Sequence, residues 1–120
     1  MINFIKQTKD YFERLNINEN DIIWVGSKDG KYACSWNNFV EKFKDLEYHN
    51  GFGGQEIAND LVVVGKDWWI ERHDYDGSEW WEFKKLPNIS ETPVEFQKVK
   101  GNSSWVSLEY INSDDDKDWE

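Results

Sequence analysis

The segment from Trp68 to Phe83 combines the residue types that bind cations at a protein surface. It holds two Trp-Trp pairs on either side of an Asp-Gly step, and residues 67–85 carry six carboxylates against one arginine. Carboxylates pair with ammonium and guanidinium groups, and the faces of Trp and Tyr rings attract the same cations. A hairpin has only two faces, so it cannot bury four indoles and six acids together. We therefore expect some of these aromatics to lie beside carboxylates at the surface and to bind a basic partner.

The Asp-Gly step at positions 76–77 predicts a β-hairpin that is closed by a two-residue turn. In that register Tyr75 pairs with Ser78, whereas a three-residue turn would shift every pair along the strands. One face is then expected to join the core, and it carries Trp68, Ile70, Arg72, Trp81 and Phe83. The other face carries Trp69, Glu71, His73, Tyr75, Trp80 and Glu82. The hairpin is acidic and aromatic with either turn, but the two turns place different residues on each face.

Like charges lie opposite each other in the two-residue register. Glu71 faces Glu82, and Asp74 faces Glu79. Such pairs destabilise the free protein and are relieved by a cation, which is typical of a surface that binds one. The residues expected to contact a partner are Trp69, Glu71, Asp74, Tyr75, Asp76, Glu79, Trp80 and Glu82.

Other patterns that could carry catalysis or hold a metal are incomplete. Cys34, His49 and His73 are the only soft nucleophiles or metal ligands in the chain. Their spacing in the sequence does not show that any two of them lie in contact. Glycines at 51–54 lack the lysine and hydroxyl residue of a phosphate-binding loop. Residues 74–77 match only a fragment of a calcium loop, because the glycine comes too early. We expect no catalytic residues, no metal site and no cofactor, and so a protein that is not an enzyme.

The hydrophobic periodicity predicts an α+β fold: an antiparallel sheet of about five or six strands, with two helices packed on one face. Apolar residues at helical spacing favour helices over 2–15 and 36–46, the second capped by Ser35. Residues 61–64 are apolar without a break, which favours a central strand covered on both faces. Segment 104–111 fits either a strand or a short helix. Further strands are expected at 21–25, 32–34 and 94–99, beside the hairpin.

A length of 120 residues suits one domain. We expect an α+β domain over 1–112 and a disordered acidic tail over 113–120. The single cysteine, Cys34, forms no internal disulfide, and the sequence shows neither a signal peptide nor an apolar run of membrane-spanning length. A cytoplasmic protein that does not bind membranes is therefore expected.

The net charge of −10 is concentrated in the second part of the chain. Residues 1–50 carry eight acids and seven bases, whereas residues 51–120 carry sixteen acids and seven bases. A surface of one sign repels nucleic acid and attracts a basic protein. Direct nucleic-acid binding is not expected. An acidic balance that serves only solubility is an alternative explanation.

Small size, acidity, abundant tryptophan and an α+β plan resemble the immunity proteins that bacteria keep against secreted toxins, including those of contact-dependent growth inhibition. The segment that contains YDGSEWWEF, from Trp68 to Phe83, also resembles a group of small uncharacterised bacterial proteins. That likeness covers mainly the middle third of the chain and transfers no active residues. The resemblance implies a bacterial antitoxin that binds a cognate toxin domain, often a basic nuclease, and covers its active site with acidic groups.

Two other classes of function fit the same residues. A phage-type inhibitor that mimics nucleic acid would use the acidic surface against a host protein. A small carbohydrate- or nucleotide-binding domain, or an enzyme, would use the aromatic rings as a platform. In the enzyme, Glu71 and Glu82 could in principle cleave a glycosidic bond.

Overall fold

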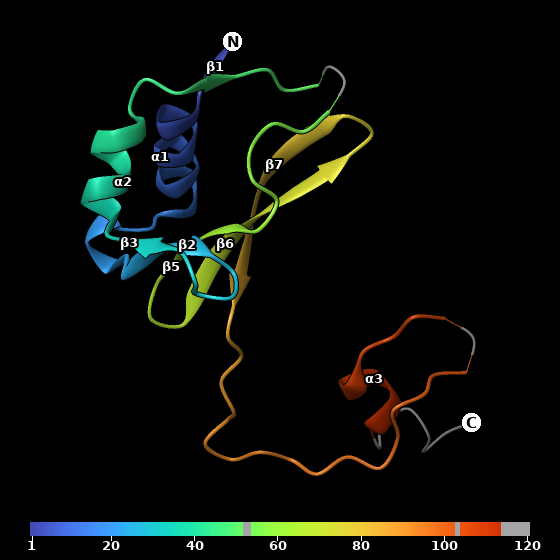
Figure 1. The fold of residues 1–120 in the computed structure, drawn as a ribbon. Coiled ribbons are helices and arrows are strands. Elements are labelled where there is room, and N and C mark those ends of the chain that lie inside the picture. Colours follow the sequence, from blue (N-terminus) through green and yellow to red (C-terminus); the bar gives the residue numbers. More distant parts are fainter. Residues whose placement is uncertain (52–53, 103, 114–120) are drawn as a thin grey trace. The chain divides into compact units, whose positions relative to one another are not determined.

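The computed structural model describes residues 1–51, 54–102 and 104–113 (Figure 1). The chain divides into two compact units, residues 1–86 and residues 87–120, which are described separately. The boundary falls directly after the last strand of the main sheet, within the single domain predicted over 1–112. Apart from Ser113, the predicted acidic tail lies outside the described residues.

The first unit is an α+β fold, as the sequence predicts. Its main sheet is antiparallel, with the strand order β3-β2-β5-β6-β7, and β1 pairs with β4 in a separate two-stranded sheet. The elements in chain order are β1 (Ile2–Asn3), α1 (Phe4–Leu15), a 3-10 turn (Glu19–Asp21), β2 (Trp24–Ser27), β3 (Ala33–Cys34), α2 (Trp36–Phe43), β4 (Glu47–Tyr48), β5 (Leu61–Val64), β6 (Trp68–Tyr75) and β7 (Ser78–Lys85).

Both long helices begin at polar caps. The side chain of Asn3 accepts a hydrogen bond from the backbone N–H of Lys6 at the start of α1. Ser35 caps α2 through the backbone N–H of Asn38, which confirms the predicted cap. The second helix ends at Phe43, three residues earlier than predicted, and the chain then enters the short strand β4.

The strand β5 lies at the centre of the sheet, as its unbroken apolar sequence predicts. Val62 and Val63 point to opposite faces, and both are almost fully buried, with 2% and 0% of their surfaces exposed. Val63 lies between Val25 of β2 and Ile70 of β6 in the strand register. These three side chains form the floor of the core beneath the helices.

The predicted hairpin register is confirmed over its full length. Tyr75 pairs with Ser78, and Glu71 pairs with Glu82. Asp76 and Gly77 have φ angles of 53° and 89°. Two successive residues with positive φ make the two-residue turn whose twist suits a hairpin, and an Asp-Gly step adopts it at little cost.

In the second unit, the predicted strand over 94–99 is wrong. Val94 and Val99 are 88% and 76% exposed, and the structure assigns no strand in this segment. The side chain of Asn112 accepts from the backbone N–H groups of Gln97 and Lys98 and donates to the carbonyl of Lys98. Asn112 makes hydrogen bonds that a neighbouring strand would otherwise make, and among the described residues no strand pairs with this segment.

The ambiguous segment 104–111 contains no strand, and its second part, from Leu108, is helical. The helix α3 covers Leu108–Asn112 and begins at Ser107, whose hydroxyl accepts from the backbone N–H of Tyr110. A serine at the position before the first helical residue favours the start of a helix.

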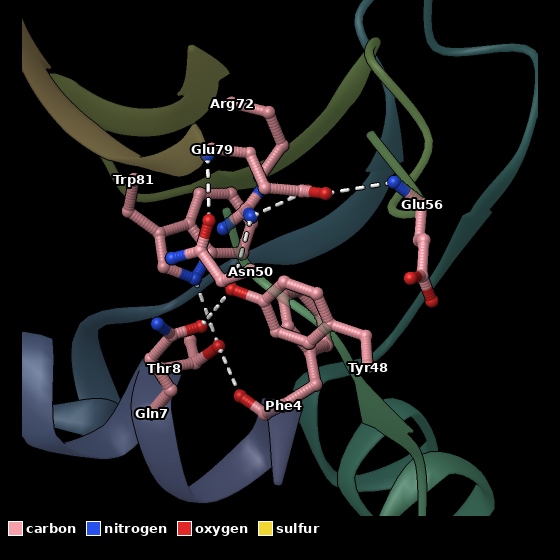
Figure 2. A network of polar contacts seen from close by, with 9 residues as sticks. All are labelled: Phe4, Gln7, Thr8, Tyr48, Asn50, Glu56, Arg72, Glu79 and Trp81. Atoms are coloured by element: carbon pink, nitrogen blue, oxygen red, sulfur yellow. Dashed lines mark hydrogen bonds and ion pairs between the residues drawn. The ribbon is translucent and has the colours of Figure 1, made fainter. Parts of the chain in front are cut away.

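A buried ion pair joins the two strands of the hairpin on their core face. Arg72 Nη2 donates to Glu79 Oε1 at 2.7 Å, and each side chain is only 3% exposed. The other carboxylate oxygen, Oε2, accepts from the backbone N–H of Glu56, and the backbone N–H of Glu79 donates to Asn50 (Figure 2). Glu79 was expected at the partner-binding surface. It lies in the interior because alternation along β7 points it to the same face as Trp81.

Aromatic rings enclose the guanidinium group of Arg72. Its central carbon lies 4.8 Å from the ring centroid of Trp81, 5.3 Å from that of Phe4 and 5.8 Å from that of Tyr48. The Trp81 indole donates to the Thr8 hydroxyl of α1 at 2.9 Å (Figure 2). The network therefore joins α1, β4 and the hairpin.

We predict that Glu79→Gln destabilises the first unit by about 3–5 kcal/mol, because it leaves the Arg72 charge buried without a counter-charge. Urea unfolding followed by circular dichroism measures the loss. The matched control is Glu82→Gln, the same change at a carboxylate that is 38% exposed, for which we expect a much smaller loss. Equal losses in the two variants would contradict the assignment of Glu79 as the buried counter-charge of Arg72.

Candidate functional site

The side chains of the hairpin alternate between the two faces of the sheet. Trp81 bonds to Thr8 and Trp68 packs against Phe12, so these two indoles lie on the face that α1 and α2 cover. Their neighbours in the chain point to the opposite face. There the outer-face cluster gathers five half-buried residues: Trp69, Glu71, His73, Trp80 and Glu82.

Each indole of the outer-face cluster donates to a carboxylate on its own strand. Trp69 Nε1 lies 2.7 Å from Glu71 Oε1, and Trp80 Nε1 lies 3.1 Å from Glu82 Oε2. Residues two apart on a strand share a face, so the spacing Trp-x-Glu is enough to produce this contact. Both aromatic rings and both acids are thereby held in one patch.

The imidazole of His73 lies between the two carboxylates. Its Nε2 is 2.8 Å from Glu71 Oε2 and 3.4 Å from Glu82 Oε1. The predicted pairing of Glu71 with Glu82 is therefore correct, but a group of the protein itself lies between the two acids. An external cation is not required to bring them together.

Two lysines at the ends of the cluster supply positive charge. Lys28 Nζ lies 3.4 Å from Glu71 Oε1, and Lys84 Nζ lies 3.5 Å from Glu82 Oε1. Lys84 lies opposite Trp69 in the hairpin, so its place follows from the register. Lys28 follows β2, which reaches β6 only through β5, and no local pattern in the sequence indicates this contact.

Both acids of the cluster have lowered pKa values. Partial burial alone would raise the pKa of Glu71, but hydrogen bonds from Trp69 and His73 and the charge of Lys28 outweigh burial and lower it. The pKa of Glu82 is lowered chiefly by the hydrogen bond from Trp80, with help from His73 and Lys84. Both carboxylates are therefore ionised at neutral pH.

The eight predicted contact residues fall into three places. Trp69, Glu71, Trp80 and Glu82 belong to the outer-face cluster. Asp74, Tyr75 and Asp76 are exposed at the hairpin tip, where 76% of the Tyr75 surface is accessible. Glu79 is in the interior.

Among the four indoles of the hairpin, Trp81 is buried and Trp68 stacks on Phe83. Trp69 and Trp80 are therefore the two indoles that lie beside the acids.

No protein-family model matches the chain, and no match was found among curated proteins or solved structures. Within the described ranges, no group of three or more His, Cys, Asp and Glu side chains is placed to hold a metal ion. None of the described helices combines the length and apolar character needed to cross a membrane.

We predict that the cluster loses stability at acidic pH. The pKa of Glu71 lies below its ordinary value of 4.5, so its ionised form stabilises the fold above that pH. This contribution disappears as the pH falls from 4.5 through the lowered pKa. The free energy of unfolding should therefore decline less steeply over this range in Glu71→Gln than in the unchanged protein. The matched control, Glu13→Gln on the exposed side of α1, should leave the slope unchanged.

Proposed function

We propose that this chain is an acidic immunity-type inhibitor that binds a basic toxin domain, such as a nuclease, and occludes its active site. The observation that carries the proposal is that two indoles and two ionised carboxylates share one patch on the face of the sheet opposite the helices. Aromatic residues are the usual energetic anchors of protein interfaces. Carboxylates beside them favour a partner that presents arginine or lysine.

The two carboxylates differ in what they can contribute. The side chain of Glu71 is only 12% exposed and contacts Trp69, His73 and Lys28. Glu82 is 38% exposed, and its lysine contact, at 3.5 Å, is the longest ion pair in the cluster. An arginine of the partner can replace that contact with a bidentate pair. Glu82 is thus the proposed direct contact, and Glu71 orients the indole and imidazole beside it.

At the hairpin tip, Tyr75 continues the face of the outer-face cluster, whereas Asp74 alternates to the face of Arg72. Asp74, Tyr75 and Asp76 are exposed, and Asp76 belongs to the two-residue turn that closes the hairpin. A preorganised tip loses little conformational entropy when it binds, which favours affinity. With a net charge of −10, the chain also attracts a basic partner at long range.

The proposal predicts that the chain protects bacteria from a toxin domain encoded beside its own gene. Co-expression of the two proteins should restore growth, and the purified proteins should form a complex that inhibits the toxin. Absence of a neighbouring toxin, or turnover of a glycan or nucleotide by the chain alone, would contradict the proposal. Tight binding to a nucleic-acid-binding host protein instead would favour the phage-type inhibitor.

The surface itself is tested by Trp80→Ala. We expect this change to weaken binding to the toxin domain by about 30-fold or more, as loss of an interface anchor does. The matched control is Trp105→Ala in the second unit, where the indole is fully exposed. Isothermal titration calorimetry measures both, and thermal unfolding checks that each variant folds. Equal effects of the two changes would show that the partner does not use the outer-face cluster.

The electrostatic part is tested by charge reversal at Asp76 and Glu82. We expect Asp76→Lys with Glu82→Lys to slow association with the toxin domain and to flatten its dependence on salt. Stopped-flow mixing at several salt concentrations measures both quantities. Charge reversal at Glu13, which lies on α1, is the control, and it should change the association rate and its salt dependence less.

A further inference from the structure

A second candidate site lies on the helix side of the sheet, away from the outer-face cluster. A cavity of about 540 Å³ opens between α2, the edge strand β3 and its neighbour β2, the strand β4 and the segment 56–61. Cavities of about 300–1,000 Å³ are typical of small-molecule sites. The described residues of the first unit form its walls, so the site belongs to that unit alone.

The interior of the cavity is apolar. Phe39 and Phe43 of α2 supply one wall, and Val25 and Leu61 of the sheet supply another. Phe43 and Leu61 pack against the core, yet both line the cavity and are only half-buried. A flat apolar molecule of one or two rings would bury this surface, and removal of apolar surface from water favours binding.

The rim of the cavity carries charge that no described ion pair uses. Lys42 lies on the α2 side, and Glu47 and Glu56 lie on β4 and the segment after it. In the described part of the chain, none of these three side chains is within salt-bridge distance of an opposite charge. Two carboxylates against one ammonium give the rim a negative balance, within a chain of net charge −10.

We propose that this cavity binds a small organic cation, with its apolar rings between α2 and the sheet and its ammonium group at the rim. The apolar walls select the ring system, and the carboxylates of Glu47 and Glu56 select the positive charge. This site is separate from the protein-binding surface, and its existence does not depend on the function proposed for that surface.

The test uses a matched pair of probes, 1-naphthylmethylamine and 1-naphthylacetate, which share a ring system and carry opposite charges. Titration of ¹⁵N-labelled full chain should shift the amide signals of Cys34, Lys42 and Ala58 with the amine. Its dissociation constant should be at least tenfold lower than that of the acid. Equal or tighter binding of the acid would overturn the proposal, as would shifts confined to Trp69 and Trp80.

Two variants locate the site. Ala58→Trp places an indole at the cavity lining from an exposed position, and it should abolish amine binding. Glu47→Gln with Glu56→Gln should remove most of the preference for the amine, whereas Glu13→Gln should not. Unchanged binding in Ala58→Trp would overturn the proposal.

A second readout requires no substitution. Cys34 lines the cavity and is half-buried, so a bound amine should slow its alkylation by a maleimide. Alkylation at the same rate with saturating amine would overturn the proposal even if Ala58→Trp fails to fold.

Discussion

The first unit depends on the burial of one charged pair, Arg72 with Glu79. A charge in a protein interior is tolerated only when a counter-charge and hydrogen bonds surround it. Glu79 accepts from Arg72 and from the backbone of Glu56, and its own backbone N–H is bound by Asn50 (Figure 2). The pair thus requires the hairpin, α1, β4 and the segment around residue 56 to be in place together.

The guanidinium group is not fully satisfied by hydrogen bonds. Within the described residues, Arg72 Nε and Nη1 have no acceptor, while Nη2 contacts Glu79 and, at 3.4 Å, the hydroxyl of Tyr48. The rings of Phe4, Tyr48 and Trp81 face the remaining surface of the group. Ring faces attract a desolvated cation, which offsets part of the cost of its burial. This explains why an arginine, with its flat charged group, occupies a position among aromatic side chains.

The hairpin was the most predictable part of the molecule, and the contacts between distant segments were the least. The Asp-Gly step determines the register, and the register places Trp69, Glu71, Trp80 and Glu82 on one face. The position of Glu79 shows the limit of this argument. The strand pattern predicts that Glu79 and Trp80 point to opposite faces. The burial of Glu79, however, depends on Asn50 and on the backbone of Glu56, which are 29 and 23 residues away. No local pattern carries that information.

The short strands β1 and β4 and the expected strand at 94–99 illustrate the same limit. Ile2 pairs with Tyr48 across most of the first half of the chain, and a two-residue strand has no periodicity to detect. The alternating sequence of 94–99 has the periodicity but no neighbouring strand in the part of the chain that the structure describes, and the side chain of Asn112 binds its backbone instead. Alternation therefore predicts a strand only where a partner strand supplies the other half of the hydrogen bonds.

One register determines both faces of the hairpin, so the core and the proposed binding surface are linked. If β6 slipped by one residue, Arg72 would move to the outer face and Glu71 would enter the core beside the aromatic rings. The cost of burying an unpaired carboxylate opposes that slip. The ion pair of the core thus holds Trp69, Trp80 and their carboxylates on the accessible face without contacting them. Substitutions on the outer face can then alter recognition while the interior network continues to hold the strands in register.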